Sequence, residues 1–257
     1  MHKYERLTNL LDSLGLGAWQ YHPVLGSTND LTLAWARAGA PDESLVLADA
    51  QTAGRGRGDR RWETEPGSGL ALSLFFRPTT EEKTCGSRFT ALLALSLVKA
   101  LEVYDLKAEV KWPNDILLVN KKVGGVLVET DWLGEELLGL VAGMGINVKA
   151  GSVPKKPLRY PAISVEDALG RNIDRWALLV EILVEMRAIR SILTEEGFID
   201  LWNAHLAFRG QWIRFISPEG TEERVKLLGV RGDGALELQE QDGENKTAIT
   251  GEIVMAA

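Results

Sequence analysis

The chain has 257 residues, a hydrophobic fraction of 45%, a charged fraction of 25% and a formal net charge of −7. This length accommodates one large domain, or a domain of about 200 residues with a small appendage. The acidic balance argues against sequence-independent nucleic-acid binding, which needs a basic surface. A single cysteine, Cys85, leaves no disulfide framework and fits a reducing cytoplasm. No apolar run has membrane-spanning length, so we expect a cytoplasmic protein without a nucleic-acid or membrane partner.

Hydrophobic periodicity predicts an α+β protein. Apolar residues at helical spacing predict helices over 4–14, 28–38, 89–101, 176–189 and 198–206. Apolar or alternating runs predict strands over 20–24, 44–48, 70–76, 109–112, 116–119, 123–130 and 137–146. Residues 151–161 are typical of a surface loop because they contain several prolines and lysines. Because several strands follow one another directly, we expect a mixed or antiparallel sheet and not a doubly wound one.

The texture of the sequence changes after Phe208. Short strands separated by glycine-containing turns are predicted over 212–216, 224–230, 235–240 and 246–249. About fifty residues of this kind are typical of a small β-barrel. We therefore predict a first domain over residues 1–207 and a second over residues 208–257.

Residues 54–62 read Gly-Arg-Gly-Arg-Gly-Asp-Arg-Arg-Trp. Glycines let a loop approach a ligand closely, and guanidinium groups bind carboxylate and phosphate in planar geometry. In this interpretation Arg57 clasps an anion, while Arg60 and Trp62 lie beyond it and the indole covers a base. The alternative, equally favoured from this segment alone, is a solvated basic loop.

Residues 111–115 read Lys-Trp-Pro-Asn-Asp. Pro113 ends a strand because it has no N–H to donate. Asp115 has the oxygen ligands that Mg²⁺ prefers, and Lys111 suits a phosphate. A turn with an Asx-type hydrogen bond is the simpler interpretation, and this segment alone favours it.

Two glycine-containing strands suggest close approach of a ligand to the backbone. Lys122 precedes Gly124 and Gly125, and a cation there lowers the repulsion between a carboxylate and a triphosphate. Asn147 follows Gly143 and Gly145 and has an amide for a ligand or for metal-bound water. The alternatives are a hairpin turn with exposed lysines and a β-bulge with a turn asparagine.

Ser27, Thr28, Asn29 and Gln51 have the polar groups to bind a heterocycle, although the first three also suit a helix N-terminus. The three histidines have no metal-ligand spacing, and no Ser–His–Asp arrangement is apparent. We therefore expect a reaction driven by positioning and charge stabilisation, and not by a protein nucleophile.

In this order, these segments resemble the biotin protein ligases, specifically the monofunctional type without a DNA-binding domain. Residues 232–236 and 251–253 resemble the C-terminal SH3-like domain of that family. The resemblance implies a mixed sheet related to class II aminoacyl-tRNA synthetases. It implies synthesis of biotinyl-5′-AMP from biotin and MgATP, then transfer of biotin to a lysine of a biotin carboxyl carrier domain, as in acetyl-CoA carboxylase.

The resemblance also assigns the site by position. Residues expected to bind biotin are Ser27, Thr28, Asn29, Gln51, Gly54, Arg55, Gly56, Arg57, Lys122 and Gly125. Residues expected to bind ATP are Arg57, Arg60, Trp62, Lys111, Asn114, Asp115 and Asn147. Arg57, Lys122 and Lys111 are the expected catalytic residues, and Asp115 is the expected Mg²⁺ ligand. Val126, Val128 and Met144 are expected to hold the apolar part of biotin.

The sequence departs from the family pattern at Gly58-Asp59, where the family usually has Arg-Gly. Asp59 is expected to add a negative charge beside the phosphates. Two alternatives stay open: a lipoate or octanoate ligase or transferase of the same fold, and a non-catalytic biotin-binding regulatory protein. The oligomeric state stays open between a monomer and a homodimer, and a sheet edge after Asn147 is a candidate interface.

Overall fold

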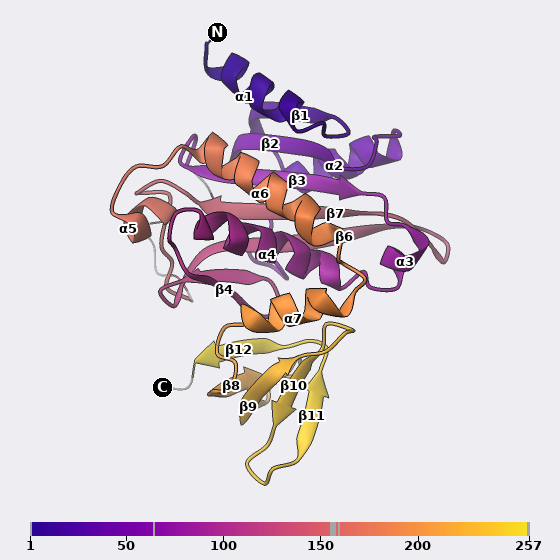
Figure 1. The fold of residues 1–257 in the computed structure, drawn as a ribbon, viewed down its shortest axis with the longest axis vertical. Helices are drawn as coiled ribbons and strands as arrows, with labels where there is room; N and C mark the ends of the chain where they lie inside the picture. The colour runs from indigo at the N-terminus through magenta and orange to yellow at the C-terminus, as the bar shows by residue number, and fades with distance from the viewer. Residues whose placement is uncertain (1, 64, 155–157, 159, 256–257) are drawn as a thin grey trace.

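The computed structural model describes residues 2–63, 65–154, 158 and 160–255. Its main sheet contains β1 (Trp19–Leu25), β2 (Ser44–Gln51), β3 (Gly69–Phe76), β4 (Ala108–Lys111), β5 (Asp115–Leu118), β6 (Lys121–Leu133) and β7 (Glu136–Asn147). Seven helices accompany it in the described residues: α1 (His2–Ser13), α2 (Thr28–Arg37), α3 (Thr80–Lys83), α4 (Arg88–Glu102), α5 (Val165–Leu169), α6 (Arg175–Arg190) and α7 (Glu196–Ala204). The strands and helices run in the predicted order (Figure 1).

The main sheet is mixed, which confirms the predicted α+β class. Its strand order is β1-β2-β3-β7-β6-β5-β4, and only β1 and β2 pair in parallel. The tight turn between β5 and β6 places Val119 and Asn120 at positive φ, as a two-residue hairpin requires. β7 pairs with β3 on one side and β6 on the other, so the sheet edge expected after Asn147 is wrong. The outer strands are β1 and β4.

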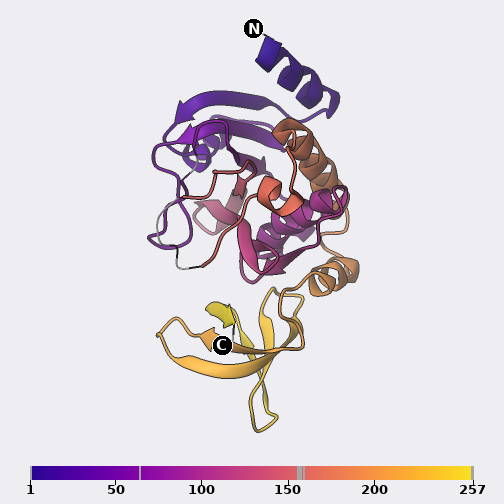
Figure 2. The ribbon, with the colours of Figure 1, turned by 90° about the vertical axis from the view of Figure 1, so that its left-hand side faces the viewer.

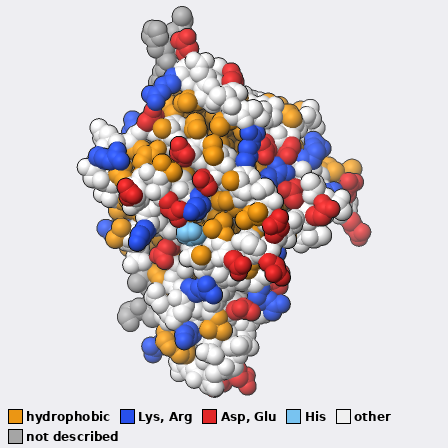
Figure 3. All heavy atoms as spheres, viewed as in Figure 1, with side chains coloured by type: hydrophobic (Ala, Val, Ile, Leu, Met, Phe, Trp, Pro, Cys, Tyr) orange, Lys and Arg blue, Asp and Glu red, His pale blue; other side chains and the backbone are white. Residues whose placement is uncertain are grey.

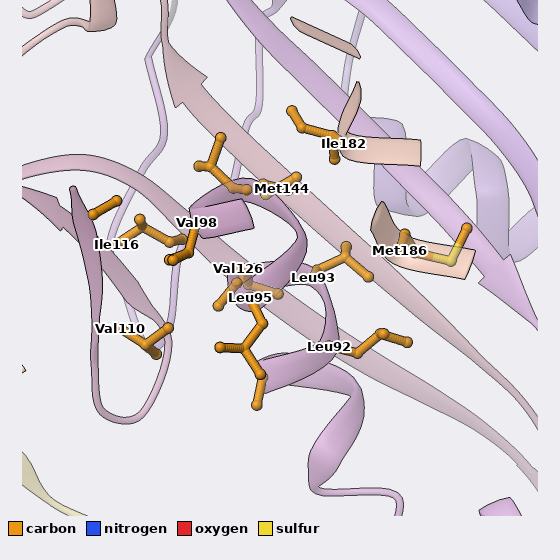
Figure 4. Close-up of a cluster of buried hydrophobic side chains, with 14 of the residues drawn as sticks. Leu92, Leu93, Leu95, Val98, Val110, Ile116, Val126, Met144, Ile182 and Met186 are labelled. Atoms are coloured by element: carbon orange, nitrogen blue, oxygen red, sulfur yellow. The ribbon is translucent and has the colours of Figure 1, made fainter. Parts of the chain in front are cut away.

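The two long helices α4 and α6 cover one face of the main sheet, as Figures 1 and 2 show. α4 is rich in leucine and alanine, which favour helix, and it is buried on most of its surface. Its side chains Leu93 and Val98 pack near Val126 of β6 and Met144 of β7 in the central core (Figure 4). α2 lies on the opposite face, against β2, β3 and β7. That face is left with room for a site.

Residues after α7 form a second sheet of five antiparallel strands: β8 (Trp212–Ile216), β9 (Glu222–Val230), β10 (Leu236–Gln239), β11 (Asn245–Ala248) and β12 (Glu252–Met255). The strand order β11-β10-β9-β8-β12 leaves β11 and β12 at opposite edges. The observed pairing of the described residues is therefore an open sheet, where a barrel was predicted. The prediction also missed β12, although residues 251–253 were noted for their resemblance to a known domain.

Two short helices were not predicted. α3 begins with a capping box, in which the Thr79 side chain and Glu82 each bond the backbone of the other. α5 ends at Gly170, which has a positive φ. Helices this short contain too few residues to show a hydrophobic period. Part of the predicted loop over 151–161, residues 155–157 and 159, lies outside the described residues.

Basic and acidic side chains are interspersed over the face seen in Figure 3. Within the described residues, the longest and most apolar helices still fall short of what a bilayer crossing needs.

Candidate functional site

A cavity of about 270 Å³ lies where α2, β6, β7 and the 54–62 loop meet. It gathers predicted site residues from every segment singled out in the sequence. Those that line it are Thr28, Asn29, Gln51, Arg55, Gly56, Arg57, Arg60, Trp62, Lys111, Asn114, Asp115, Lys122, Gly125 and Asn147. Ser27 and Gly54 are buried but do not line it. Ser27 instead occupies the N-cap position of α2.

The floor of the cavity is bare backbone at paired glycines. Gly125 of β6 lies opposite Gly145 of β7. A Cβ atom on Gly145 would lie 2.2 Å from Cε2 of the Trp62 indole, and one on Gly125 would lie 3.1 Å from Nζ of Lys122. Both side chains therefore rest on strand positions that only glycine leaves open.

Val126 and Met144 also border the cavity, but their side chains belong to the core beneath it. They are 2% and 3% exposed and join the same core cluster as the α4 leucines (Figure 4). Side chains alternate along a strand, so their neighbours Gly125 and Gly145 face the opposite side of the sheet. Val128 borders a separate cavity beside the C-terminal sheet.

A polar corner closes one end of the cavity. Gln51 Oε1 accepts hydrogen bonds from the backbone N and the Oγ1 of Thr28, at 2.7 and 3.1 Å. Ser73 Oγ lies 2.7 Å from Thr28 Oγ1 and 2.6 Å from Asn29 Oδ1. Asn29 Nδ2 donates to Glu129, so Asn29 supports the wall. Sequence reasoning assigned no role to Ser73 or Glu129, because each lies within a strand that shows no sign of its partners across the sheet.

The 54–62 loop is a narrow hairpin at its base. Its backbone bonds run from Trp62 N to Gly54 O at 3.0 Å and from Gly56 N to Arg60 O at 2.7 Å. At the tip, Gly58 has a φ of +66°, which glycine adopts without strain. Asp59 is exposed and is not among the residues that line the cavity, which speaks against its expected place beside the phosphates.

Arg55 ties this hairpin to the main sheet. Its guanidinium lies 2.6 Å from Asp30 of α2 and 2.7 Å from Glu129 of β6. The hydrogen bond with Asp30 is the largest of the stabilising effects that raise the pKa of Arg55. The side chain is engaged by the protein, so any ligand contact of Arg55 would fall to its backbone.

The tip of the hairpin contacts the C-terminal sheet. Arg57 donates to Thr250 Oγ1 at 2.9 Å and to the Gly251 carbonyl at 3.4 Å. Arg60 pairs with Glu252 of β12 at 2.9 Å. Glu252 also lines the cavity, so the second sheet closes one side of the site. In the sequence, residues 251–253 were noted only for their resemblance to an SH3-like domain.

Two lysines occupy different electrostatic environments in the cavity. Lys122 Nζ lies 2.5 Å from Asp115 Oδ1, while Lys111 is 3% exposed and lies over the Tyr160 ring at 4.4 Å. Burial lowers the pKa of Lys111, and the charges of Asp115 and Glu252 partly oppose that shift. The described residues contain no cluster of three or more metal-ligating side chains. Asp115 still suits Mg²⁺ that arrives with phosphate oxygens, because such sites need only one or two carboxylates.

Comparison with known proteins identifies relatives across most of the chain. The model of the Biotin/lipoate A/B protein ligase family matches residues 21–147. The bifunctional ligase/repressor BirA of Bacillus subtilis is 34% identical over 238 residues, which cover 88% of this chain and 70% of that protein. The biotin–[acetyl-CoA-carboxylase] ligase of Paracoccus denitrificans is 32% identical over 228 residues, which cover 83% of this chain and 90% of that protein.

Solved structures show the same fold. The biotin protein ligase of Aquifex aeolicus in complex with biotin and ATP has a TM-score of 0.77 at 24% identity, covering 93% of this chain and 98% of that one. The Leishmania major enzyme in complex with biotinyl-5-AMP has a TM-score of 0.60 at 23% identity, covering 91% and 99%. Together with the sequence relatives, this places the chain in the biotin/lipoate A/B protein ligase family, as a homologue of the biotin protein ligases.

Proposed function

We propose that this chain is an ATP-dependent biotin–protein ligase. It forms biotinyl-5′-AMP from biotin and MgATP, and then transfers biotin to a lysine of a biotin carboxyl carrier domain, such as that of acetyl-CoA carboxylase. The observation that carries the proposal is the shared cavity, in which Arg57, Lys111 and Lys122 lie near a polar corner. The names of the homologues support it.

The chemistry asks the protein mainly for positioning and charge. The biotin carboxylate attacks the α-phosphorus of ATP, and pyrophosphate leaves. The amine of the carrier lysine then attacks the acyl carbon, and AMP leaves. In the first step two anions must meet, and the cations of Arg57, Lys111 and Lys122 offset their repulsion.

We assign the polar corner to the ureido head of biotin. Thr28 and Gln51 already orient each other, and the Gln51 amide keeps its N–H groups for a carbonyl acceptor. Ser27 and Gly54 do not line the cavity, and they support the residues that do. Gly125 leaves space for the valeryl chain beside Lys122.

We assign the opposite end to the nucleotide. Trp62 offers a ring face to the base, and Arg60 an anion-binding group. Asn114 Nδ2 donates to the Val126 carbonyl at 2.8 Å, and Asn147 Nδ2 donates to the Ile163 carbonyl at 3.4 Å. The side-chain oxygen of each amide is therefore the group that it offers to the nucleotide. Asp115 would hold the Mg²⁺ of MgATP, which neutralises phosphate charge when bound.

We also infer the domain division at residues 1–207 and 208–257, with the second domain of SH3-like type. Its contribution to the site is Glu252, through Arg60. The ATP requirement and the single cysteine support action in the cytoplasm. A homodimer stays a prediction, for which β1 and β4 are the outer strands.

Intact mass of a carrier domain tests the proposal directly. The carrier is incubated with the chain, MgATP and either biotin, lipoate or octanoate. We expect a gain of one biotinyl group with biotin alone, and none without ATP. A lipoyl or octanoyl adduct in its place would support the lipoate-ligase alternative. Calorimetric binding of biotin with neither adenylate nor adduct would support a regulatory protein.

A further inference from the structure

Residues Tyr160–Ile163 run beside the start of β6 and contact two cavity residues. Lys122 N donates to the Pro161 carbonyl at 2.8 Å, and Ile163 N donates to the Lys122 carbonyl at 3.0 Å. The Ile163 carbonyl accepts from Asn147 Nδ2 at 3.4 Å. The N–H and carbonyl groups of Lys122 therefore hold residues Pro161–Ile163, which follow Tyr160, beside β6.

That ring faces the buried ammonium of Lys111. Nζ lies 4.4 Å from the ring centroid. The charged groups around it come from every neighbouring element, and they oppose one another. They are Asp115 of β5, Lys122 of β6, Arg60 of the hairpin and Glu252 of β12. Asp115 is already paired with Lys122, and Glu252 with Arg60.

We propose that Tyr160 is a positioning residue for Lys111: its ring face holds the ammonium group in place before the nucleotide phosphates arrive. An aromatic face attracts a cation most strongly where water is excluded, and Lys111 is 3% exposed. The role rests on the proposed function, in which Lys111 stabilises phosphate charge.

The hydroxyl of Tyr160 is not part of this role. Oη is buried and has no hydrogen-bond partner among the described residues. Burial, and next the charge of Asp115, raise the pKa of Tyr160, so the phenol stays neutral at pH 7. Tyr160→Phe keeps the ring and is the matched control, whereas Tyr160→Leu keeps apolar bulk but removes the ring.

The test is the pH profile of adenylation, followed as pyrophosphate release at varied MgATP. In Tyr160→Leu we expect the alkaline limb to move down by about one pH unit and the KM for MgATP to rise about tenfold. Tyr160→Phe should match the wild type, and so should Tyr104→Leu, at a half-buried tyrosine beyond the cavity lining. Biotin affinity, measured by calorimetry, should change by less than about twofold.

A fluorinated series separates the ring's charge distribution from its packing. Phenylalanine with increasing numbers of ring fluorines at position 160 keeps the shape while weakening the attraction for a cation. We expect the alkaline limb to move down stepwise with fluorine number. A flat series, or identical profiles for Tyr160→Leu and Tyr160→Phe, would overturn the proposal.

A second readout does not depend on turnover. The ¹⁵N resonance of Lys111 Nζ, assigned through Lys111→Met, should titrate at lower pH in Tyr160→Leu than in the wild type. An unchanged titration would overturn the role of the ring even if the wild type is active. An inactive wild type with a shifted titration would instead overturn the proposed function alone.

Discussion

Replacing Gly145 with alanine should displace the Trp62 indole from the cavity floor. The new methyl carbon would lie 2.2 Å from Cε2 and 2.5 Å from both Cδ2 and Nε1. Ordinary carbon contacts are about 3.5 Å or longer, so the ring must move by about 1 Å or more. Gly145 cannot yield, because β7 is held there between Ala71 of β3 and Gly125 of β6.

The size of the effect follows from where the ring can go. Overpacking inside a closed core costs about 1–3 kcal/mol, and the half-buried indole can swing outward, so we expect a stability loss near 1 kcal/mol. The larger loss should be in nucleotide binding. A base stacked on an aromatic ring contributes about 1–3 kcal/mol, so ATP affinity should fall about tenfold.

Urea unfolding and calorimetry with biotin and ATP measure both quantities. The control is the same substitution in a Trp62→Ala background, where the methyl group has room. There Gly145→Ala should cost less than about 0.5 kcal/mol and leave ATP affinity unchanged. An equal loss in both backgrounds would refute the contact with Trp62 as the cause.

Burial lowers the pKa of Lys111, so between its folded and unfolded values the unfolded chain binds more protons and stability rises with pH. Lys111→Met should therefore raise the free energy of unfolding at pH 7 by about 1 kcal/mol while abolishing adenylation, unlike the exposed control Lys121→Met. Burial also lowers the pKa of His205, so urea unfolding should show stability falling as pH drops below 6.5, with a smaller slope in His205→Asn. Arg57→Gly should speed release of biotinyl-AMP, followed by filter binding, by about tenfold more than it weakens biotin binding. Asp59→Gly should keep the rate of pyrophosphate release within about twofold of the wild-type rate, and a faster rate would show that Asp59 lies close to the phosphates.

Long apolar runs located the main sheet from the sequence. Apart from Ser73, residues 70–76 are apolar on both faces because β3 is buried between α2 on one side and the α4–α6 layer on the other. The order of the strands in the sheet was not predictable, because the apolar pattern of a strand does not indicate which strand it pairs with. The paired positions of Gly125 and Gly145 emerge only from the register of β6 on β7.

The site was predictable where a motif concentrates unusual residues, but the partner of each residue was not. The arginines of the hairpin show this, since Arg55 and Arg57 look equivalent in sequence. The structure pairs Arg55 with two carboxylates and leaves Arg57 with two neutral oxygens of the turn between β11 and β12. Glu252 and Tyr160 reach the cavity from segments remote in the chain, so local spacing carries no signal for them.

The central position of β7 in the sheet determines which parts of the molecule open locally. A strand hydrogen-bonded on both flanks loses its amide protons to deuterium only when the domain as a whole opens. The hairpin above it is joined by a few bonds at its base and tip, and its amides should exchange far sooner. Substrate would therefore enter and product leave by motion of the 54–62 hairpin alone, while the main sheet beneath it stays folded throughout the cycle.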